Sequence, residues 1–381
     1  VLAILEEWGI LMKKVGILSK QRTSNYGSVL QCFAFEKKLD ELGYQSEIID
    51  YYPEENTILG QLKLLRGKTK MFKNPLLYLL GLMAFFPSYL KKQVVFEKYL
   101  DNYLKLTNKT YKLPEEITDN DPYEDIYCCG GDQTLHGFKV LDVFDNLSDN
   151  AVKVAYSSSF GKDKFEKNEF DHAKRSLARF DALSCREDSG VAVMHKMGFT
   201  NAKWIIDPAF LFTADEWKKY KSSKYDGKKF ILVYNLHHDK KIENYQKELS
   251  KKYQFPVINV CMHWFEAYRY GKTLWVPSVE DFLSLFYNAE FVLSDSFHAT
   301  VFSLLFHKKF MTIAPDIVGA RIKSISNLFG LQNRVIDWNK NKDYIEIMNE
   351  EINFTEIDSI IDRERKKAVE FIKQWKGIQH E

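Results

Sequence analysis

Cysteine is scarce in this chain of 381 residues, and its five cysteines include no CxxC pair and no histidine at metal-ligand spacing. This pattern excludes a disulfide-stabilised scaffold and a structural zinc site, and it predicts a reduced protein of the cytoplasm. A large excess of charge of one sign is also missing, because 54 Lys and Arg stand against 52 Asp and Glu. The net charge of +2 argues against a dedicated nucleic-acid binder.

Long hydrophobic runs are absent as well. The longest apolar stretch, Leu76–Phe86, has 11 residues, whereas a membrane-spanning helix needs about 20. Residues 1–11 contain no methionine, no basic n-region and no small-residue cleavage site, so they do not resemble a signal peptide. We expect Met12 to be the natural start of a chain that does not cross a membrane.

What is present is ordinary globular composition, with 45% hydrophobic and 28% charged residues. The length exceeds what one core usually holds, and strand and helix patterns alternate, so we expect an α/β protein of two Rossmann-like domains facing a cleft. The expected domains are 12–208, carrying an insertion at 60–112, and 229–381, with a C-terminal helix that can pack back. Residues 209–228 would link them.

Short apolar runs followed by polar or glycine-bearing turns mark the strands. A helix is expected from about Gly27 to Leu42. The expected strands of the first domain are Val15–Ser19, Ser46–Tyr51, Ile126–Cys129, Val152–Ser157, Asp181–Arg186 and Lys203–Ile206. Those of the second are Phe230–Tyr234, Val257–Val260, Phe291–Leu293 and Phe310–Ile313.

One segment, 63–98, has an unusual charge, with eight basic residues against the single acid Glu97. Within it, Pro75 and Pro87 frame the apolar stretch as a hairpin. Basic flanks around an apolar hairpin are typical of peripheral contact with an anionic membrane leaflet. The alternative is a core helix with a solvated basic face, which is the commoner arrangement.

The most informative segment is 292–302, where an apolar strand ends and small polar residues lead into an apolar-periodic helix. Asp295, Ser296 and His298 are thereby placed at a helix N-terminus, where free backbone N–H groups favour a bound anion. A histidine there can exchange a proton with a bound phosphate or carboxylate substrate. The alternative is that a polar residue of this turn only caps the helix and His298 fills space.

Three other strand ends share this geometry. Gly27 lets a ligand approach the backbone beside the side chains of Asn25 and Tyr26. A glycine pair precedes two polar residues in the segment Gly130-Gly131-Asp132-Gln133. Arg186 follows a strand and can grip a phosphate or carboxylate with two hydrogen bonds. No glycine segment matches the fingerprints of dinucleotide or P-loop binding.

Six blocks in order resemble the polysaccharide pyruvyl transferase family along almost the whole chain. They are 15–18 with 25–31, Gly130–Gln133, Tyr156–Gly161, Ser184–Glu187, Asp207-Pro208 with Leu211, and Asp295–Ser303. The resemblance implies a glycosyltransferase-B-like fold. It also implies that pyruvate moves from phosphoenolpyruvate onto two hydroxyls of a sugar and forms a cyclic ketal, in the biosynthesis of cell-surface polysaccharide.

The same resemblance implies roles for individual residues. His298 would be the general acid, and we expect it to be protonated in the ternary complex, helped by the donor phosphate and, if its carboxylate points inward, by Asp295. Arg186 would bind the donor, and Asn25, Tyr26, Gly27, Gly131, Asp132 and Gln133 would contact donor or acceptor. No cofactor and no metal are expected. The acceptor would be a saccharide on a lipid carrier at the inner face of the cell membrane.

The chain departs from the family pattern before the histidine, where some members carry an arginine and this chain has Ser296 and Phe297. The donor anion then needs charge from Arg321 or Arg334, unless the donor differs. Two alternatives therefore stay open. One is a glycosyltransferase that uses a nucleotide sugar on the same scaffold, and the other is a non-catalytic carbohydrate-binding subunit.

Overall fold

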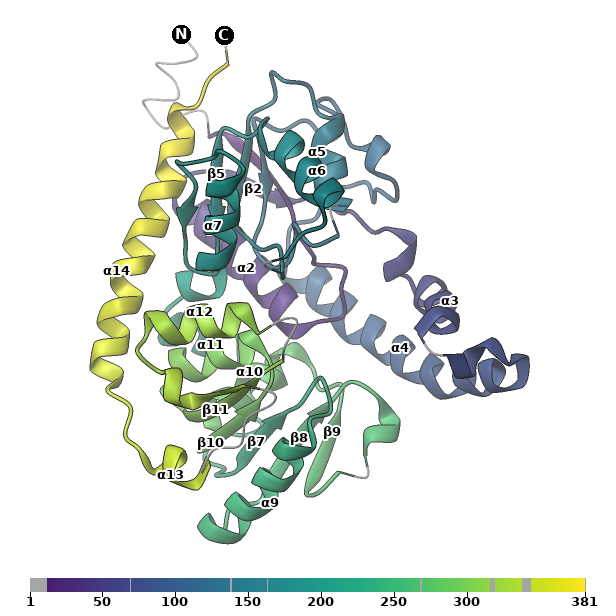
Figure 1. Cartoon of the computed structure of the whole chain (residues 1–381), viewed down its shortest axis with the longest axis vertical. Helices are drawn as coiled ribbons and strands as arrows, with labels where there is room; N and C mark the ends of the chain where they lie inside the picture. Colours follow the sequence, from purple (N-terminus) through teal and green to yellow (C-terminus); the bar gives the residue numbers. More distant parts are fainter. Residues whose placement is uncertain are drawn as a thin grey trace. The chain divides into compact units, whose positions relative to one another are not determined.

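The computed structural model describes residues 12–68, 70–137, 139–162, 164–267, 269–315, 319–337 and 344–380. The expected natural start at Met12 concerns residues 1–11, which lie outside the described residues. Two parallel six-stranded sheets with helices packed on them make up an α/β fold, as expected (Figure 1). None of the helices in the described ranges is long and apolar enough to cross a membrane.

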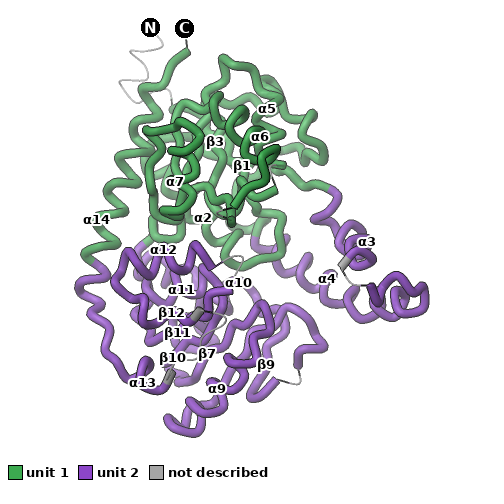
Figure 2. Tube along the Cα trace, viewed as in Figure 1, with its two compact units in different colours: residues 1–53, 100–212, 359–381 green, residues 54–99, 213–358 purple. Residues whose placement is uncertain are grey.

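The chain divides into two compact units, which Figure 2 colours separately. Unit 1 takes in the described residues within 1–53, 100–212 and 359–381, and unit 2 those within 54–99 and 213–358. The sequence assigned most of 54–99 to an insertion in the first domain, whereas the structure groups this segment with the second sheet. Tyr44 donates a hydrogen bond to the carbonyl of Ile372 (2.7 Å), which holds the end of the C-terminal helix in unit 1.

Unit 1 contains a parallel sheet in the order β2-β1-β3-β4-β5-β6. Its strands are β1 (Lys14–Leu18), β2 (Gln45–Ile48), β3 (Ile126–Cys129), β4 (Lys153–Ser158), β5 (Ala182–Cys185) and β6 (Lys203–Trp204). Its helices are α2 (Tyr26–Glu41), α5 (Lys139–Asn146), α6 (Lys167–Leu177) and α7 (Asp188–Lys196). β3 and β4 are buried along their whole length, because helices cover both faces of a parallel sheet.

Unit 2 contains a second parallel sheet in the order β12-β11-β10-β7-β8-β9. Its strands are β7 (Ile231–Tyr234), β8 (Val257–Cys261), β9 (Lys272–Trp275), β10 (Phe291–Ser294), β11 (Lys309–Ala314) and β12 (Val335–Asp337). Its helices are α8 (Ala214–Lys218), α9 (Lys240–Tyr253), α10 (Val279–Asn288), α11 (Phe297–Leu305), α12 (Ala320–Leu328) and α13 (Tyr344–Asn349). The sequence did not predict β9 and β12, two short strands at the edges of this sheet.

The remaining helices are α3 (Ile58–Lys68), α4 (Pro75–Tyr103) and α14 (Phe354–Lys373). The expected hairpin between Pro75 and Pro87 is wrong, because α4 continues through Pro87 as one helix. A proline removes one hydrogen bond, to the carbonyl four residues earlier. That residue is Met83, which is exposed, so water can replace the lost bond.

The order of strands defines a switch point in each sheet, where the direction of winding reverses. In unit 1 it falls between the neighbours β1 and β3, and in unit 2 between the neighbours β7 and β10. Open α/β sheets bind ligands outside the carboxyl ends of the strands at such a point. The segments 19–28 and 130–133 follow the first pair of strands, and 235–239 and 295–298 follow the second, so most sequence-predicted site residues lie at a switch point.

Glu124 precedes β3 and predicts how the stability of unit 1 depends on pH. Its side chain is buried, with Lys14 Nζ at 3.5 Å. The pKa of Glu124 is raised from 4.5 to about 8, mainly by burial and also by the neighbouring Glu47, while Lys14 opposes the rise. Since the folded-state pKa lies above the unfolded one, the folded state holds the proton more tightly, and stability is lost as the pH rises from about 4.5 to 8.

Glu124→Gln should remove this loss, because glutamine keeps the size of the side chain and stays neutral. At about 1.4 kcal/mol per pKa unit, the gain in free energy of unfolding at pH 9 is on the order of 3–5 kcal/mol, and it should vanish near pH 4. Urea denaturation of both proteins across this range measures the difference. Parallel curves for the two proteins would contradict the assignment.

Candidate functional site

The turn between β10 and α11 has the predicted strand-to-helix geometry. Ser296 is the N-cap residue of α11, and its hydroxyl accepts a hydrogen bond from the N–H of Ala299. Ser294 fixes the turn by accepting from the N–H of Ser296 (3.0 Å) and donating to the carbonyl of Tyr234 (2.7 Å). His298 therefore occupies the first turn of the helix, and 6% of its surface is exposed.

Asp295 connects the two sides of the switch point in unit 2. One carboxylate oxygen accepts from the N–H of Leu236 (2.8 Å), and the other accepts from the N–H of His237 (2.7 Å) and lies 2.9 Å from its Nδ1. The Asp295 side chain is fully buried, whereas that of His237 is 42% exposed. Asp295 thus fixes the loop after β7 and orients the His237 ring, instead of pairing with His298 as expected.

Phe297, His298 and Arg321 are brought together at the start of two helices. The rings of Phe297 and His298 are 5.2 Å apart and nearly perpendicular. The guanidinium of Arg321, from the first turn of α12, lies 5.8 Å from the centre of the Phe297 ring. An arginine on an aromatic face keeps its charge and can still reach an anion. Of the two arginines that the sequence offered for the donor anion, Arg321 is the one at the carboxyl end of the sheet.

Arg334 is used for structure. Its guanidinium donates to the carbonyl of Phe310, near the start of β11 (3.1 Å), and to the carbonyl of Glu350 (2.5 Å). Phe310 lies at the amino end of the sheet, opposite to His298. This geometry does not favour Arg334 as a ligand for the donor.

A second cationic group borders the same switch point, and the sequence analysis missed it. The buried Arg269 contacts Glu266 (3.1 Å) and His238 Nδ1 (2.6 Å), and it donates to the carbonyl of Asn235 (3.4 Å). Burial raises the pKa of Glu266, although Arg269 and His238 oppose this. His238 has a φ of +58°, which is uncommon for a residue with a side chain. The sequence signal that could have predicted this group is the pair of adjacent histidines that follows a strand.

Arg186 in unit 1 lies in a buried ion network. Its guanidinium contacts Asp132 (3.0 Å) and Asp207 (2.8 Å), and Glu187 lies 4.0 Å from its Nε. The Arg186 side chain has no exposed surface. Burial alone would lower the pKa of Arg186, but the three carboxylates outweigh it and raise the pKa. The arginine that the sequence assigned to the donor is thus surrounded by more negative charge than it neutralises.

The residues around Gly27 and Gly131 either belong to this ion network or have structural roles in capping and packing. The Asn25 side chain caps α2 by accepting from the N–H groups of Gly27 (2.9 Å) and Ser28 (3.3 Å), and Tyr26 is fully buried. A Cβ on Gly131 would lie 2.7 Å from Pro208, so glycine is needed there for packing. Asp132 contacts Ser28 and has a φ of +71°.

A family model described as polysaccharide pyruvyl transferase matches residues 25–317, which include the segments 130–133, 235–239 and 295–298 at the switch points. The chain belongs to this family. The expected family is thereby confirmed, and as a member of it the chain is a transferase. A comparison with curated proteins found no match.

Solved structures similar to this pyruvyl transferase family member confirm the glycosyltransferase-B-like fold. UDP-GlcNAc 2-epimerase from Methanocaldococcus jannaschii is 13% identical, with a TM-score of 0.53 over 92% of both chains. Another UDP-N-acetylglucosamine 2-epimerase is 9% identical, with a TM-score of 0.51 over 97% of both chains. MnaA of S. aureus, in a co-structure with UDP, is 12% identical, with a TM-score of 0.50 over 95% of this chain and 91% of that one. At these identities the likeness shows the fold alone.

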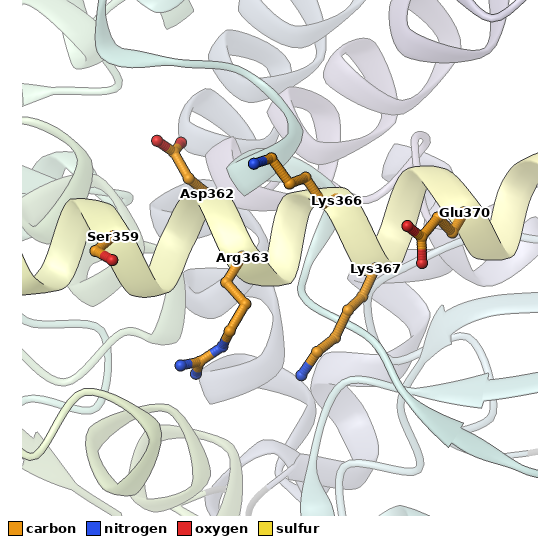
Figure 3. Close-up of a pocket in the computed structure, with 6 residues that line it drawn as sticks. All are labelled: Ser359, Asp362, Arg363, Lys366, Lys367 and Glu370. Atoms are coloured by element: carbon orange, nitrogen blue, oxygen red, sulfur yellow. The ribbon is translucent and has the colours of Figure 1, made fainter.

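Two further features of the transferase include none of the sequence-predicted site residues. A cavity of about 620 Å³ is lined by six residues of α14 alone, with charges of both signs, and Figure 3 shows these side chains along one helix. All five cysteines are free and buried, and burial raises the pKa of Cys261 to about 11. Such a thiol is a poor nucleophile at neutral pH.

The expectation that no metal is needed stays a prediction. In the described part of unit 1, ligand atoms of Asp142, Asp145 and His172 lie within 4.8 Å of one another on α5 and α6. Two of these residues are exposed, and exposed acidic groups commonly bind no ion. None of the sequence-predicted site residues belongs to this group.

Proposed function

We propose that this protein transfers pyruvate from phosphoenolpyruvate onto two hydroxyls of a saccharide and forms a cyclic ketal in cell-surface polysaccharide biosynthesis. The observation that carries the proposal is the cluster of cationic and imidazole groups at the switch point of unit 2. Phosphoenolpyruvate has a phosphate and a carboxylate, and both are bound well by arginine and by helix N-termini. Arg321 and the first turn of α11 offer these partners beside His298.

Charge supports placing the donor in unit 2. Around Arg186 in unit 1, three carboxylates within 4.0 Å face one guanidinium, so a further anion there would meet repulsion. The group in unit 2 has two arginines and three histidines, namely Arg269, Arg321, His237, His238 and His298. Its two carboxylates already have partners, because Asp295 contacts His237 and Glu266 contacts Arg269. Asp132, Gln133 and Asn25 stay proposed contacts for an uncharged acceptor, whereas Tyr26 is fully buried.

In the proposed reaction, protonated His298 gives its proton to the methylene carbon of the donor, which becomes a methyl group. The carbon that bears the phosphate develops positive charge, and one sugar hydroxyl attacks it. Phosphate leaves with the electrons of its C–O bond, and the second hydroxyl closes the ring. Of the two hydroxyl protons released, one restores His298 and the other leaves with phosphate. No cofactor enters this balance.

Asp295 acts in this scheme as a positioning residue. It holds the N–H groups of Leu236 and His237, so it fixes the loop that places the His237 imidazole at the edge of the site. We propose that His237 then binds the donor phosphate. Arg186 is assigned to the organisation of the loop that carries Asp132, and it contacts no donor in this scheme.

Incubation with phosphoenolpyruvate labelled at its methylene carbon and with a saccharide carrying two neighbouring free hydroxyls tests the proposal. The expected result is one phosphate released per labelled methyl group found in a ketal. In heavy water this methyl group should gain one deuterium from the acid. Labelled nucleotide sugars in parallel form the control. Transfer from a nucleotide sugar and none from phosphoenolpyruvate would refute the proposal.

A nucleotide sugar is the second candidate donor, because the similar solved structures are UDP-GlcNAc 2-epimerases and an UDP co-structure. The fold alone does not favour it, since one scaffold can serve many reactions. For the acceptor, we propose a saccharide on a lipid carrier, met in the cytoplasm at the inner face of the membrane.

A further inference from the structure

Residues 54–99 form an arm of unit 2, built from α3 and most of α4, which projects from the rest of the unit in Figure 2. The arm has its own small core of Leu62, Leu65, Phe72 and Tyr89. The opposite side of α4 is also apolar, although it is exposed to solvent. Its exposed apolar residues are Leu76, Leu77, Leu79, Leu80, Met83, Phe86, Leu90 and Val94.

The exposed apolar residues form a stripe along the helix. Leu76, Leu80, Met83, Leu90 and Val94 recur at helical spacing, and about two-thirds of the surface of Leu76 and Met83 is exposed (65% and 67%). Scattered exposed leucines are common on proteins, whereas a continuous apolar stripe marks an interaction surface. The core-helix alternative considered for this segment does not describe α4, because its second apolar face is uncovered.

The inner face of α4 is fixed to the loop after β8. Trp264 donates through Nε1 to the carbonyl of Ala84 (2.6 Å) and through its N–H to Ser88 (3.1 Å). The ring of Phe85 packs at 5.1 Å against both His263 and Phe265. The outer stripe is therefore held on a well-packed support, with the half-exposed Trp264 beside it.

Charge distinguishes between partners for this stripe. The arm has eight basic residues against Glu54, Glu55 and Glu97, so it carries a net charge of +5 in a chain of +2. Lys70, Lys73 and Lys98 are exposed in this segment, whereas Arg66 lies over the ring of Tyr78. Two copies of this surface would repel each other if they met face to face. An apolar stripe with basic flanks and an exposed tryptophan matches an anionic bilayer surface.

We propose that the outer face of the arm binds the surface of an anionic lipid bilayer, with α4 lying in the interface. The loop fixed to α4 leads directly into Glu266 and Arg269, beside the switch point of unit 2. Binding through the arm therefore holds the carboxyl-end loops of this sheet close to the membrane surface. The inference rests on exposure and charge, and it does not depend on the donor that the enzyme uses.

Co-sedimentation of the full chain with vesicles tests the proposal. The protein should bind vesicles containing phosphatidylglycerol at low salt, bind less as salt rises, and bind vesicles of phosphatidylcholine alone weakly. Lys70→Gln with Lys73→Gln should lower the partition coefficient about 5-fold per lysine, roughly 25-fold together. Leu76→Ser, Leu80→Ser and Met83→Ser combined should reduce binding to background.

The control is Lys251→Gln with Lys252→Gln on α9, two exposed lysines whose loss should leave binding unchanged. The melting temperatures of all variants should equal that of the wild type, since the substituted side chains are exposed. The proposal is overturned if the wild-type protein does not bind anionic vesicles, or if the serine variant binds them as well as the wild type does. Sedimentation equilibrium tests whether a second copy of the chain covers the stripe instead. A wild-type protein that is a dimer and a serine variant that is a monomer would make the stripe an interface between copies.

Discussion

Replacing His298 by alanine is expected to lower kcat for pyruvyl transfer by about 10²- to 10⁴-fold, which is the usual cost of removing a general acid. The methylene carbon of the donor must gain a proton, and in the proposed scheme His298 supplies it from the first turn of α11. In the same proposed scheme the donor anion contacts Arg321 and backbone N–H groups, so its KM should change less than kcat.

His298 is largely buried, so alanine also removes packing against Phe297. His298→Gln is therefore the better variant, since it keeps much of the volume and the polarity while removing an acid active at neutral pH. Both variants should lose deuterium incorporation into the product in heavy water. His307→Ala, which removes an exposed histidine of unit 2, should keep full activity. Turnover by His298→Gln within a few-fold of the wild type would remove His298 from the mechanism.

Replacing Arg186 by alanine is expected to lower the free energy of unfolding by about 3–5 kcal/mol, the usual cost of removing one partner of a buried ion pair. The variant leaves the carboxylates of Asp132 and Asp207 buried without their shared counter-charge. Arg186→Lys should recover only part of the loss, because one ammonium group cannot reproduce the guanidinium fork between two carboxylates. Urea denaturation measures both variants.

Arg175→Ala serves as the matched control, because this arginine is exposed on α6 in the same unit and should cost at most about 0.5 kcal/mol. Adding Asp207→Asn to Arg186→Ala should restore part of the stability, since it removes one of the uncompensated buried charges. If Arg186→Ala instead keeps its stability and only raises the KM for the donor, the role expected from sequence is correct and the structural role is not.

Much of the fold was predictable because its pattern is local. A run of apolar residues such as Ile126–Cys129 between turns suffices to mark a buried parallel strand, and the structure places β3 at the same residues. The strand-to-helix turn at 294–298 was predictable for the same reason. β9 and β12 were missed because they are short edge strands. Pro87 led to the wrong prediction of a hairpin, because the free-energy cost of a proline inside a helix depends on whether water can reach the carbonyl that loses its hydrogen bond.

The sequence by itself determined the α/β class, the family and the positions of the strand-end segments, because each of these is set by neighbouring residues and their order. Only the tertiary structure decided what the charged and apolar groups do there. Arg186 meets Asp132 and Asp207, 54 and 21 residues away in the chain, at the carboxyl ends of buried strands. Asp295 likewise reaches Leu236 and His237 instead of the nearby His298. Whether a group is paired or uncovered depends on residues brought together by folding, and no local pattern contains that information.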